Sequence, residues 1–177
     1  MLKKYLNIFL FIILIFIYVI YINSLIKQFN VLEYFRKIPG FKDVFNERAV
    51  VILIDILQIV TVFVSNIFQS IVISLVVSIV TKIKLRLKCT LAIVLMGNII
   101  TTFLNAIIFS LTKITKIKQA AIIGSLPVSW IIISIILIVY LNKKEITVKK
   151  LFLTELSLII IGILLFLVNL FTLRGLK

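Results

Sequence analysis

One apolar run, residues 49–80, is longer than a membrane crossing requires and contains neither glycine nor proline. A helix of that length measures about 48 Å, whereas the hydrocarbon layer of a bilayer is about 30 Å thick. Two shorter crossings would need a tight turn, which the residues of this run do not favour. We therefore predict one long helix with its membrane core at about residues 60–82 and its first part in the interface or packed on other helices.

Four further apolar runs are separated by short polar or basic segments. Hydrophobic residues make up 63% of the chain and the mean hydropathy is +1.29, whereas soluble domains contain roughly 45–50% apolar residues. The runs do not alternate residue by residue, as the strands of a membrane barrel do. The sequence predicts an all-α fold, a polytopic membrane helical bundle with five transmembrane helices, of which the other four lie at about residues 5–21, 90–111, 126–141 and 150–173.

The first run resembles a signal peptide because two lysines precede it. Its apolar stretch exceeds the usual length of about 7–15 residues, and no small-residue cleavage site follows it. We predict that it stays attached as a signal anchor, with Tyr18, Tyr21 and Asn23 at its far interface. The chain is then divided into this anchor, an extracytoplasmic loop or interfacial segment, and a four-helix membrane domain, at residues 1–27, 28–48 and 49–177.

The segment 28–48 mixes charged and apolar residues. An apolar residue recurs at helical spacing in its first half, which favours an amphipathic helix in the headgroup region; an ordinary solvated loop is an equally good interpretation. The recurring residues are Phe29, Leu32, Phe35 and Ile38. Pro39 and Gly40 then form the strongest turn signal in the chain.

The segment GSLPVSW, residues 124–130, allows two interpretations of the fourth helix. If the helix began at Gln119, Pro127 would remove a backbone hydrogen bond and bend it. If Ser125 capped the helix, Pro127 would lie in the first turn, where its missing N–H needs no partner, and Trp130 would lie near the headgroups. The capped start is favoured, with residues 119–124 as a short interfacial approach.

The net charge of +14 is spread over the ends of the apolar runs. Attraction to anionic lipid headgroups explains this pattern, and the lack of a basic face with interleaved aromatic residues argues against nucleic-acid binding. With the amino terminus inside, ten of the twenty basic residues, including those of segments 82–88 and 142–150, are cytoplasmic. We predict a multi-pass protein of a bacterial cell membrane with a cytoplasmic amino terminus and an extracytoplasmic carboxyl terminus.

The residue types that most enzyme chemistry requires are scarce in this chain. Cys89 is the only cysteine and histidine is absent, so disulfides within the chain, histidine-based triads and histidine-ligated metal sites are excluded. Neither a GxxxxGK nor a GxGxxG phosphate loop occurs. We therefore predict no catalytic residue, no cofactor and no metal site.

Two rows of small or hydrogen-bonding residues recur every four positions in the second and third predicted helices. Such rows allow membrane helices to approach closely, so we predict that both face protein rather than lipid. An alternative role for Asn66, Asn98 and Asn105 is to line a substrate path. The rows are Asn66, Ser70, Ser74 and Ser78, and Asn98, Thr102, Ala106 and Ser110, the second flanked by Gly97, Thr101 and Asn105.

Asp55 and Glu155 are the only acidic residues within the apolar runs. A charge at the centre of a bilayer costs about 3 kcal/mol, but both residues lie near predicted helix ends, where the penalty is smaller. Interfacial solvation, or an ion pair of Glu155 with Lys150, is the simpler interpretation. A proton-coupled role is the functional alternative, although five crossings would place the two acids on opposite sides of the membrane.

Residues 60–170 resemble the Yip family, the Ypt/Rab-interacting-protein-like membrane domain, in its bacterial form. The resemblance rests on the long second helix with its basic turn, on KCTLAIVLMGNIITTFLNAIIF, and on LPVSWIIISIILIVYLNKKEITVKK. Gly97 and Asn98 stand where the family often has a proline, and the fourth helix is poor in glycine. The resemblance implies five membrane helices, a cytoplasmic amino terminus and no catalytic chemistry. Eukaryotic members bind small GTPases, and bacterial ones include partners of ABC exporters.

The leading functional hypothesis is a non-enzymatic accessory or interaction subunit of a membrane complex, such as an ABC exporter or an antimicrobial-peptide protection system. Its partners would be the lipid bilayer, other membrane proteins such as ABC transporter subunits, or a second copy of the chain. The alternative is a transporter or channel subunit, for which paired broken helices would be expected but are not evident. A membrane enzyme ranks third because no nucleophile and base cluster in the sequence.

Overall fold

The computed structural model describes residues 2–37, 46–112, 114, 117–144 and 146–175, and within these residues every regular element is a helix. Five stretches are long and apolar enough to cross a membrane, at Tyr5–Gln28, Glu47–Thr81, Leu87–Leu111, Gln119–Asn142 and Val148–Leu173. The predicted all-α bundle of five membrane-spanning helices is therefore confirmed. The helices are α1 (Leu2–Gln28), α2 (Val31–Arg36), α4 (Glu47–Thr81), α5 (Leu87–Leu111), α6 (Ile117–Gly124), α7 (Val128–Asn142) and α8 (Val148–Gly175).

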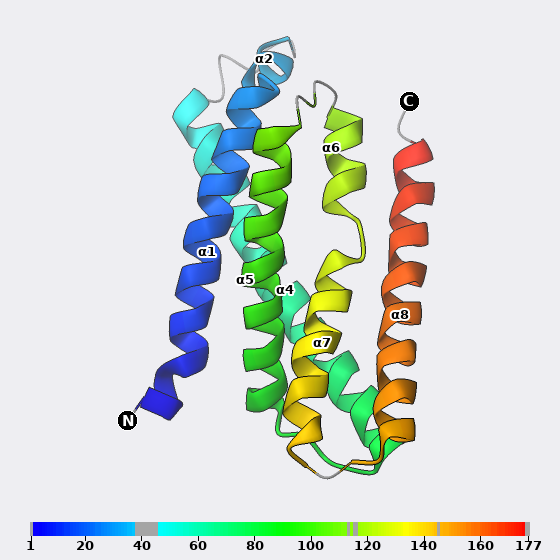
Figure 1. Cartoon of the computed structure of the whole chain (residues 1–177). Coiled ribbons are helices and arrows are strands. Elements are labelled where there is room, and N and C mark those ends of the chain that lie inside the picture. Colours follow the sequence, from blue (N-terminus) through cyan, green and yellow to red (C-terminus); the bar gives the residue numbers. More distant parts are fainter. Residues whose placement is uncertain (1, 38–45, 113, 115–116, 145, 176–177) are drawn as a thin grey trace.

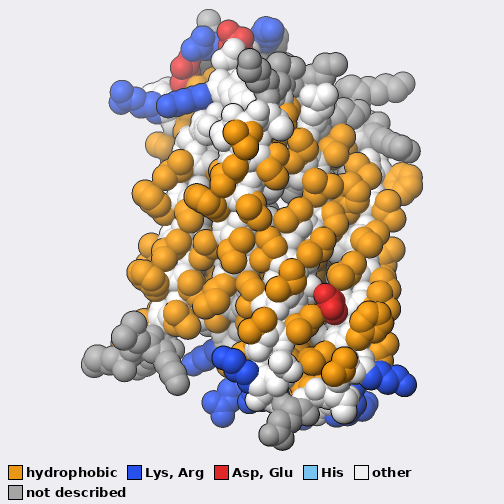
Figure 2. Space-filling view, in the orientation of Figure 1, with side chains coloured by type: hydrophobic (Ala, Val, Ile, Leu, Met, Phe, Trp, Pro, Cys, Tyr) orange, Lys and Arg blue, Asp and Glu red, His pale blue; other side chains and the backbone are white. Residues whose placement is uncertain are grey.

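The bundle has α5 at its centre, packed against α1, α4 and α7 (Figure 1). Helix α4 crosses obliquely behind the others, so that it approaches α1 at one end of the bundle and α8 at the other. We call these the C end, where α8 finishes and α2 and α6 lie, and the N end, where α1 begins. Apolar side chains form a broad band between the two ends; on this face most charged side chains lie at the ends, and one acidic side chain lies within the band (Figure 2).

Helix α4 is continuous over 35 residues, as the absence of turn residues predicted. It begins at Asn46, whose side chain accepts a hydrogen bond of 2.6 Å from the backbone N–H of Arg48. It ends at Lys82, which adopts a left-handed conformation (φ 65°) and donates its N–H to the carbonyl of Ser78. A straight helix of this length measures about 52 Å. A helix longer than the hydrocarbon layer is thick commonly tilts in the bilayer, and α4 follows such an oblique path.

The segment 28–48 was predicted to be either an amphipathic helix or a solvated loop, and the structure shows a helix over one short stretch of it. Helix α2 covers six residues, and Phe29, Leu32 and Phe35 around it are half-buried. An ion pair between Arg36 and Glu47 joins the end of α2 to the start of α4. The predicted turn at Pro39 and Gly40, and the fourth apolar position at Ile38, lie outside the described residues.

The fourth crossing is neither kinked nor capped as predicted, because it consists of two helices. Helix α6 ends at Gly124, and α7 begins at Val128 with Pro127 itself at the N-cap position. Ser125 does not cap α7; its hydroxyl instead donates to the carbonyl of Ile122 (2.8 Å), in the last turn of α6. Helix α6 packs on α5 and α8 within the bundle and continues the path of α7, so it belongs to the crossing rather than to a separate interfacial approach (Figure 1).

Two close contacts lie near the middle of the bundle, where α7 packs between α5 and α8. A side chain at Gly97 of α5 would collide with Ile133, and a Cβ at Gly162 of α8 would lie 2.8 Å from the Cβ of Trp130. Trp130 is buried at 5% exposure, so its predicted position near the headgroups is wrong. The two glycines let α7 approach both neighbours closely, and the indole fills the resulting space.

Candidate functional site

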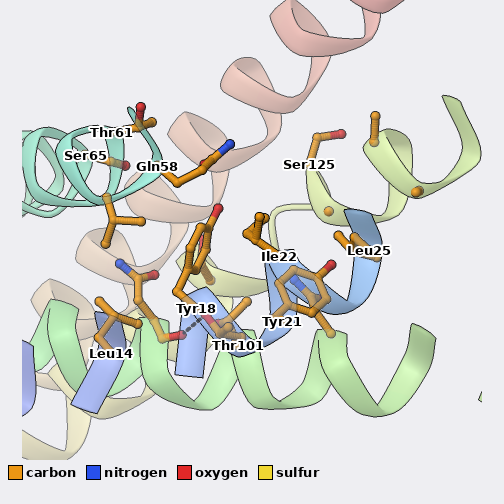
Figure 3. Close-up of a pocket in the computed structure, with 18 of the residues that line it drawn as sticks. Leu14, Tyr18, Tyr21, Ile22, Leu25, Gln58, Thr61, Ser65, Thr101 and Ser125 are labelled. Carbon is orange, nitrogen blue, oxygen red and sulfur yellow. Dashed lines mark hydrogen bonds between the residues drawn. The ribbon is translucent and has the colours of Figure 1, made fainter. Parts of the chain in front are cut away.

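A cavity of about 660 Å³ opens among α1, α4, α5, α6 and α8 in the half of the bundle nearer the C end. Its wall is rich in uncharged polar side chains, and none of the described residues that line it carries a charge. Figure 3 shows Tyr18 and Tyr21 of α1, Gln58 of α4 and Thr101 of α5 around the same space. Six side-chain amides line it: Gln58, Asn66, Gln69, Asn98, Asn105 and Asn169.

The floor of the cavity is a network of amides that joins α4 to α5. The amide nitrogen of Asn98 donates to the side-chain oxygens of Asn66 and Gln69, each at 2.9 Å. The amide nitrogen of Asn66 donates to the carbonyl of Val62 at 2.6 Å, and Asn66 is only 2% exposed. These bonds fix the three amides in position, so the floor is rigid and polar.

The two predicted rows meet at this floor but diverge beyond it. Ser70 and Thr102 are buried, and Ser74 donates to the carbonyl of Leu85 at 3.3 Å. Ser78 is half-buried, near the N end. The prediction that the rows face protein fails at Ser110, which is exposed in the last turn of α5, because α4 has diverged from α5 toward the C end.

Between the amide network and the N end, an apolar core fills the bundle. Its side chains come from α4, α5, α7 and α8 and are almost completely buried. The most deeply buried of these side chains do not line the cavity, so the cavity ends at this core. The most deeply buried members are Ile73, Val77, Val94, Ile133, Leu137, Leu141 and Leu158.

Several polar side chains in the cavity wall have no hydrogen-bond partner within the described residues. They include Tyr18 and Tyr21, the two tyrosines predicted at the far interface of the first helix, which line the cavity (Figure 3). Polar groups inside a membrane bundle are costly unless water, a ligand or a partner satisfies them, so these side chains are available for such hydrogen bonds. The unpartnered side chains are Tyr18, Tyr21, Gln58, Ser65, Asn105, Ser129 and Asn169.

The break between α6 and α7 lies on the cavity wall, where Gly124, Ser125 and Ser129 line the space. The backbone N–H of Ser125 donates to the carbonyl of Ala121 at 3.0 Å, which satisfies the end of α6. Non-helical backbone at membrane depth is tolerated where it borders a polar cavity rather than lipid. The position of the break therefore fits its polar surroundings.

The structure places Asp55 and Glu155 at opposite ends of the bundle. Asp55 lies in a crevice between α1 and α4 that is too narrow for a water molecule and that shares the lining residues Tyr18 and Gln58 with the large cavity. Its Oδ1 atom is buried and has no hydrogen-bond partner among the described residues. Glu155 is half-exposed on α8, and no ion pair joins it to Lys150 in this described stretch.

No family model, curated protein or solved structure matches this chain. The resemblance to the Yip family therefore stays a prediction, and the geometry of the cavity is the main guide to function.

Sequence reasoning found Asn66, Asn98 and Asn105, which the structure brings to one cavity, but it missed the contributions of α1 and of further residues of α4. Gln58, Ser65 and Gln69 are spaced by seven and four residues, so they share one helical face. That spacing could have indicated from the sequence that these three side chains line the same space. Nothing comparable marks Tyr18 and Tyr21, whose inward orientation depends on how α1 packs against α5.

Proposed function

We propose that this chain is a non-enzymatic integral membrane protein that binds a polar solute in its cavity, as a subunit of a transporter or channel. The observation that carries this proposal is the set of unpartnered polar side chains around a space of about 660 Å³ in the bundle. Small-molecule sites typically have volumes of roughly 300–1,000 Å³. A space of this size with this lining suits a solute better than it suits purely structural packing.

Two further features support a role in transport. The apolar core closes the cavity toward the N end, as expected of a binding site that is reached from one face of the membrane at a time. The broken crossing at Ser125–Pro127 borders the site, and discontinuous helices commonly form substrate sites in secondary transporters. With the predicted cytoplasmic amino terminus in a bacterial cell membrane, the cavity would face the outside.

One observation favours the predicted accessory subunit as a second candidate. Thr61, Ser65 and Asn169 line the cavity and are also exposed, so the rim places polar groups where lipid would otherwise lie. A membrane helix of a partner, such as a subunit of an ABC exporter, would cover these groups and hydrogen-bond to them. This role agrees with what the Yip resemblance implies.

Matched cysteine variants test the solute-binding proposal. Ser129 and Ser134 both lie in α7, but Ser129 lines the cavity whereas Ser134 is 1% exposed in the core. In a Cys89→Ser background, we expect Ser129→Cys in proteoliposomes to react with a membrane-impermeant thiol reagent from one side and Ser134→Cys to remain unreactive. An unreactive Ser129→Cys from both sides would contradict a water-filled binding cavity.

A cysteine variant in the same Cys89→Ser background tests the second candidate, the accessory subunit. If a partner covers the rim, Ser65→Cys should be protected in native membranes and become reactive after purification. Equal reactivity in both states would argue against a partner at this position.

A further inference from the structure

We infer that the cavity takes an uncharged solute with several hydrogen-bonding groups around an apolar face, of about the size of a disaccharide or a capped dipeptide. This inference rests on the proposed function and specifies its ligand. It follows from the charge, the hydrogen-bonding groups and the aromatic surface of the cavity.

The lack of charge in the described lining argues against an ionic ligand. An ion that leaves water for a membrane bundle needs a countercharge or a coordinating cage, and without one its desolvation is strongly unfavourable. Asp55 is not among the residues that line the large cavity, so it supplies no countercharge in its wall. A neutral solute loses far less hydration free energy when it enters the cavity.

The amides in the wall suit hydroxyl or amide groups on the ligand. A side-chain amide offers two donor hydrogens and an acceptor oxygen, so it can bind either kind of group in either direction. Gln58 of α4 and Asn105 of α5 approach the cavity from different helices and have no partner within the described residues. On the floor, both hydrogens of the Asn98 amide are directed to Asn66 and Gln69, which leaves the Asn98 oxygen as an acceptor.

The tyrosines of α1 provide the apolar face. Tyr18 and Tyr21 lie edge to face with ring centroids 6.3 Å apart, and Tyr21 also packs on Phe109 of α5 at 5.7 Å. Aromatic rings held in this way present a fixed surface to the apolar face of a sugar ring or to a peptide side chain, while their hydroxyls remain available for hydrogen bonds. Amides opposite aromatic rings thus select a solute that is both polar and partly apolar.

The experiment measures how solutes slow the labelling of Ser129→Cys in the Cys89→Ser protein. Two matched pairs differ in charge: lactose with the uronate formed by oxidation of its galactose C6, which keeps both sugar rings, and N-acetyl-dialanine amide with N-acetyl-dialanine. We expect the neutral member of at least one pair to slow labelling about tenfold more than its charged counterpart, which corresponds to about 1.4 kcal/mol in favour of the neutral form. The two pairs distinguish a sugar from a peptide.

Equal protection by charged and neutral probes, or no protection by any probe, would overturn the ligand class while leaving a reactive, water-filled cavity. An unreactive Ser129→Cys would instead overturn the proposed function itself. Gln58→Ala combined with Asn105→Ala should abolish protection without abolishing labelling. Ser157→Ala is the control, because its side chain lies on α8 outside the cavity lining.

Discussion

At the scale of single residues, the contacts of the glycines decide how closely the helices pack. Gly97 and Gly124 both lie in helices, but a Cβ at Gly97 would collide with Ile133, whereas nothing lies within 4 Å of a Cβ at Gly124. We expect Gly97→Ala to lower the free energy of unfolding by about 1–3 kcal/mol, because α7 would have to move. Gly124→Ala should be neutral or slightly stabilising, since alanine favours a helix. Apparent melting temperatures in detergent would show the difference, and equal values would contradict the close approach of α5 and α7.

The carboxyl group of Asp55 gives a second prediction at this scale. One of its oxygens is buried without a partner among the described residues, which is costly for a group that can carry charge. Asp55→Asn keeps the shape and removes the charge, so we expect stability to rise by about 1 kcal/mol. Glu155→Gln, at a half-exposed site, should change little. A clear loss of stability in Asp55→Asn would show that the acid has a ligand or partner, such as a bound cation.

At the scale of elements, the amide network is the main polar link between α4 and α5. Asn98→Ala would leave the side-chain oxygens of Asn66 and Gln69 without their donor, so we expect a loss of about 1–2 kcal/mol in thermal unfolding. Ser110→Ala, in the exposed last turn of the same helix, is the control and should have no effect. Similar losses in both variants would indicate that the network contributes nothing specific.

The sequence predicted the elements well where local chemistry decides them. The length of α4 followed from the absence of turn residues, and Pro127 marked the start of α7, although the inclusion of α6 in the same crossing was not predicted. The role of Ser125 could not be predicted, because its hydroxyl had a choice between the start of α7 and the end of α6. Only the packing of α6 against its neighbours decides between them.

The cavity itself was not predictable, because it arises from the arrangement of distant elements. Asn66 and Asn98 stood out by their spacing, but the space they border exists only because α4 crosses obliquely and separates from α6 and α8 toward the C end. The buried position of Trp130 was missed for a similar reason. Its site depends on Gly162, far away in the sequence.

At the scale of the whole molecule, the five crossings place both described basic turns at the N end. In the Cys89→Ser background, Lys84→Cys and Lys144→Cys should therefore be labelled from one side of the membrane and Glu33→Cys from the other. All three residues are exposed, so burial does not confound the result. With a cytoplasmic amino terminus, the two lysine positions would react from the inside. Labelling of Lys84→Cys and Glu33→Cys from the same side would contradict the number of crossings.

The uncharged lining of the cavity also determines how the protein responds to the electrical potential across its membrane. Moving one elementary charge through 100 mV corresponds to about 2.3 kcal/mol, which is enough to change an affinity more than tenfold. A neutral occupant that enters a site without ionised side chains moves no charge through that field. Its affinity should therefore be the same in energised and de-energised vesicles, so occupancy would depend only on the solute concentration on the side to which the cavity opens.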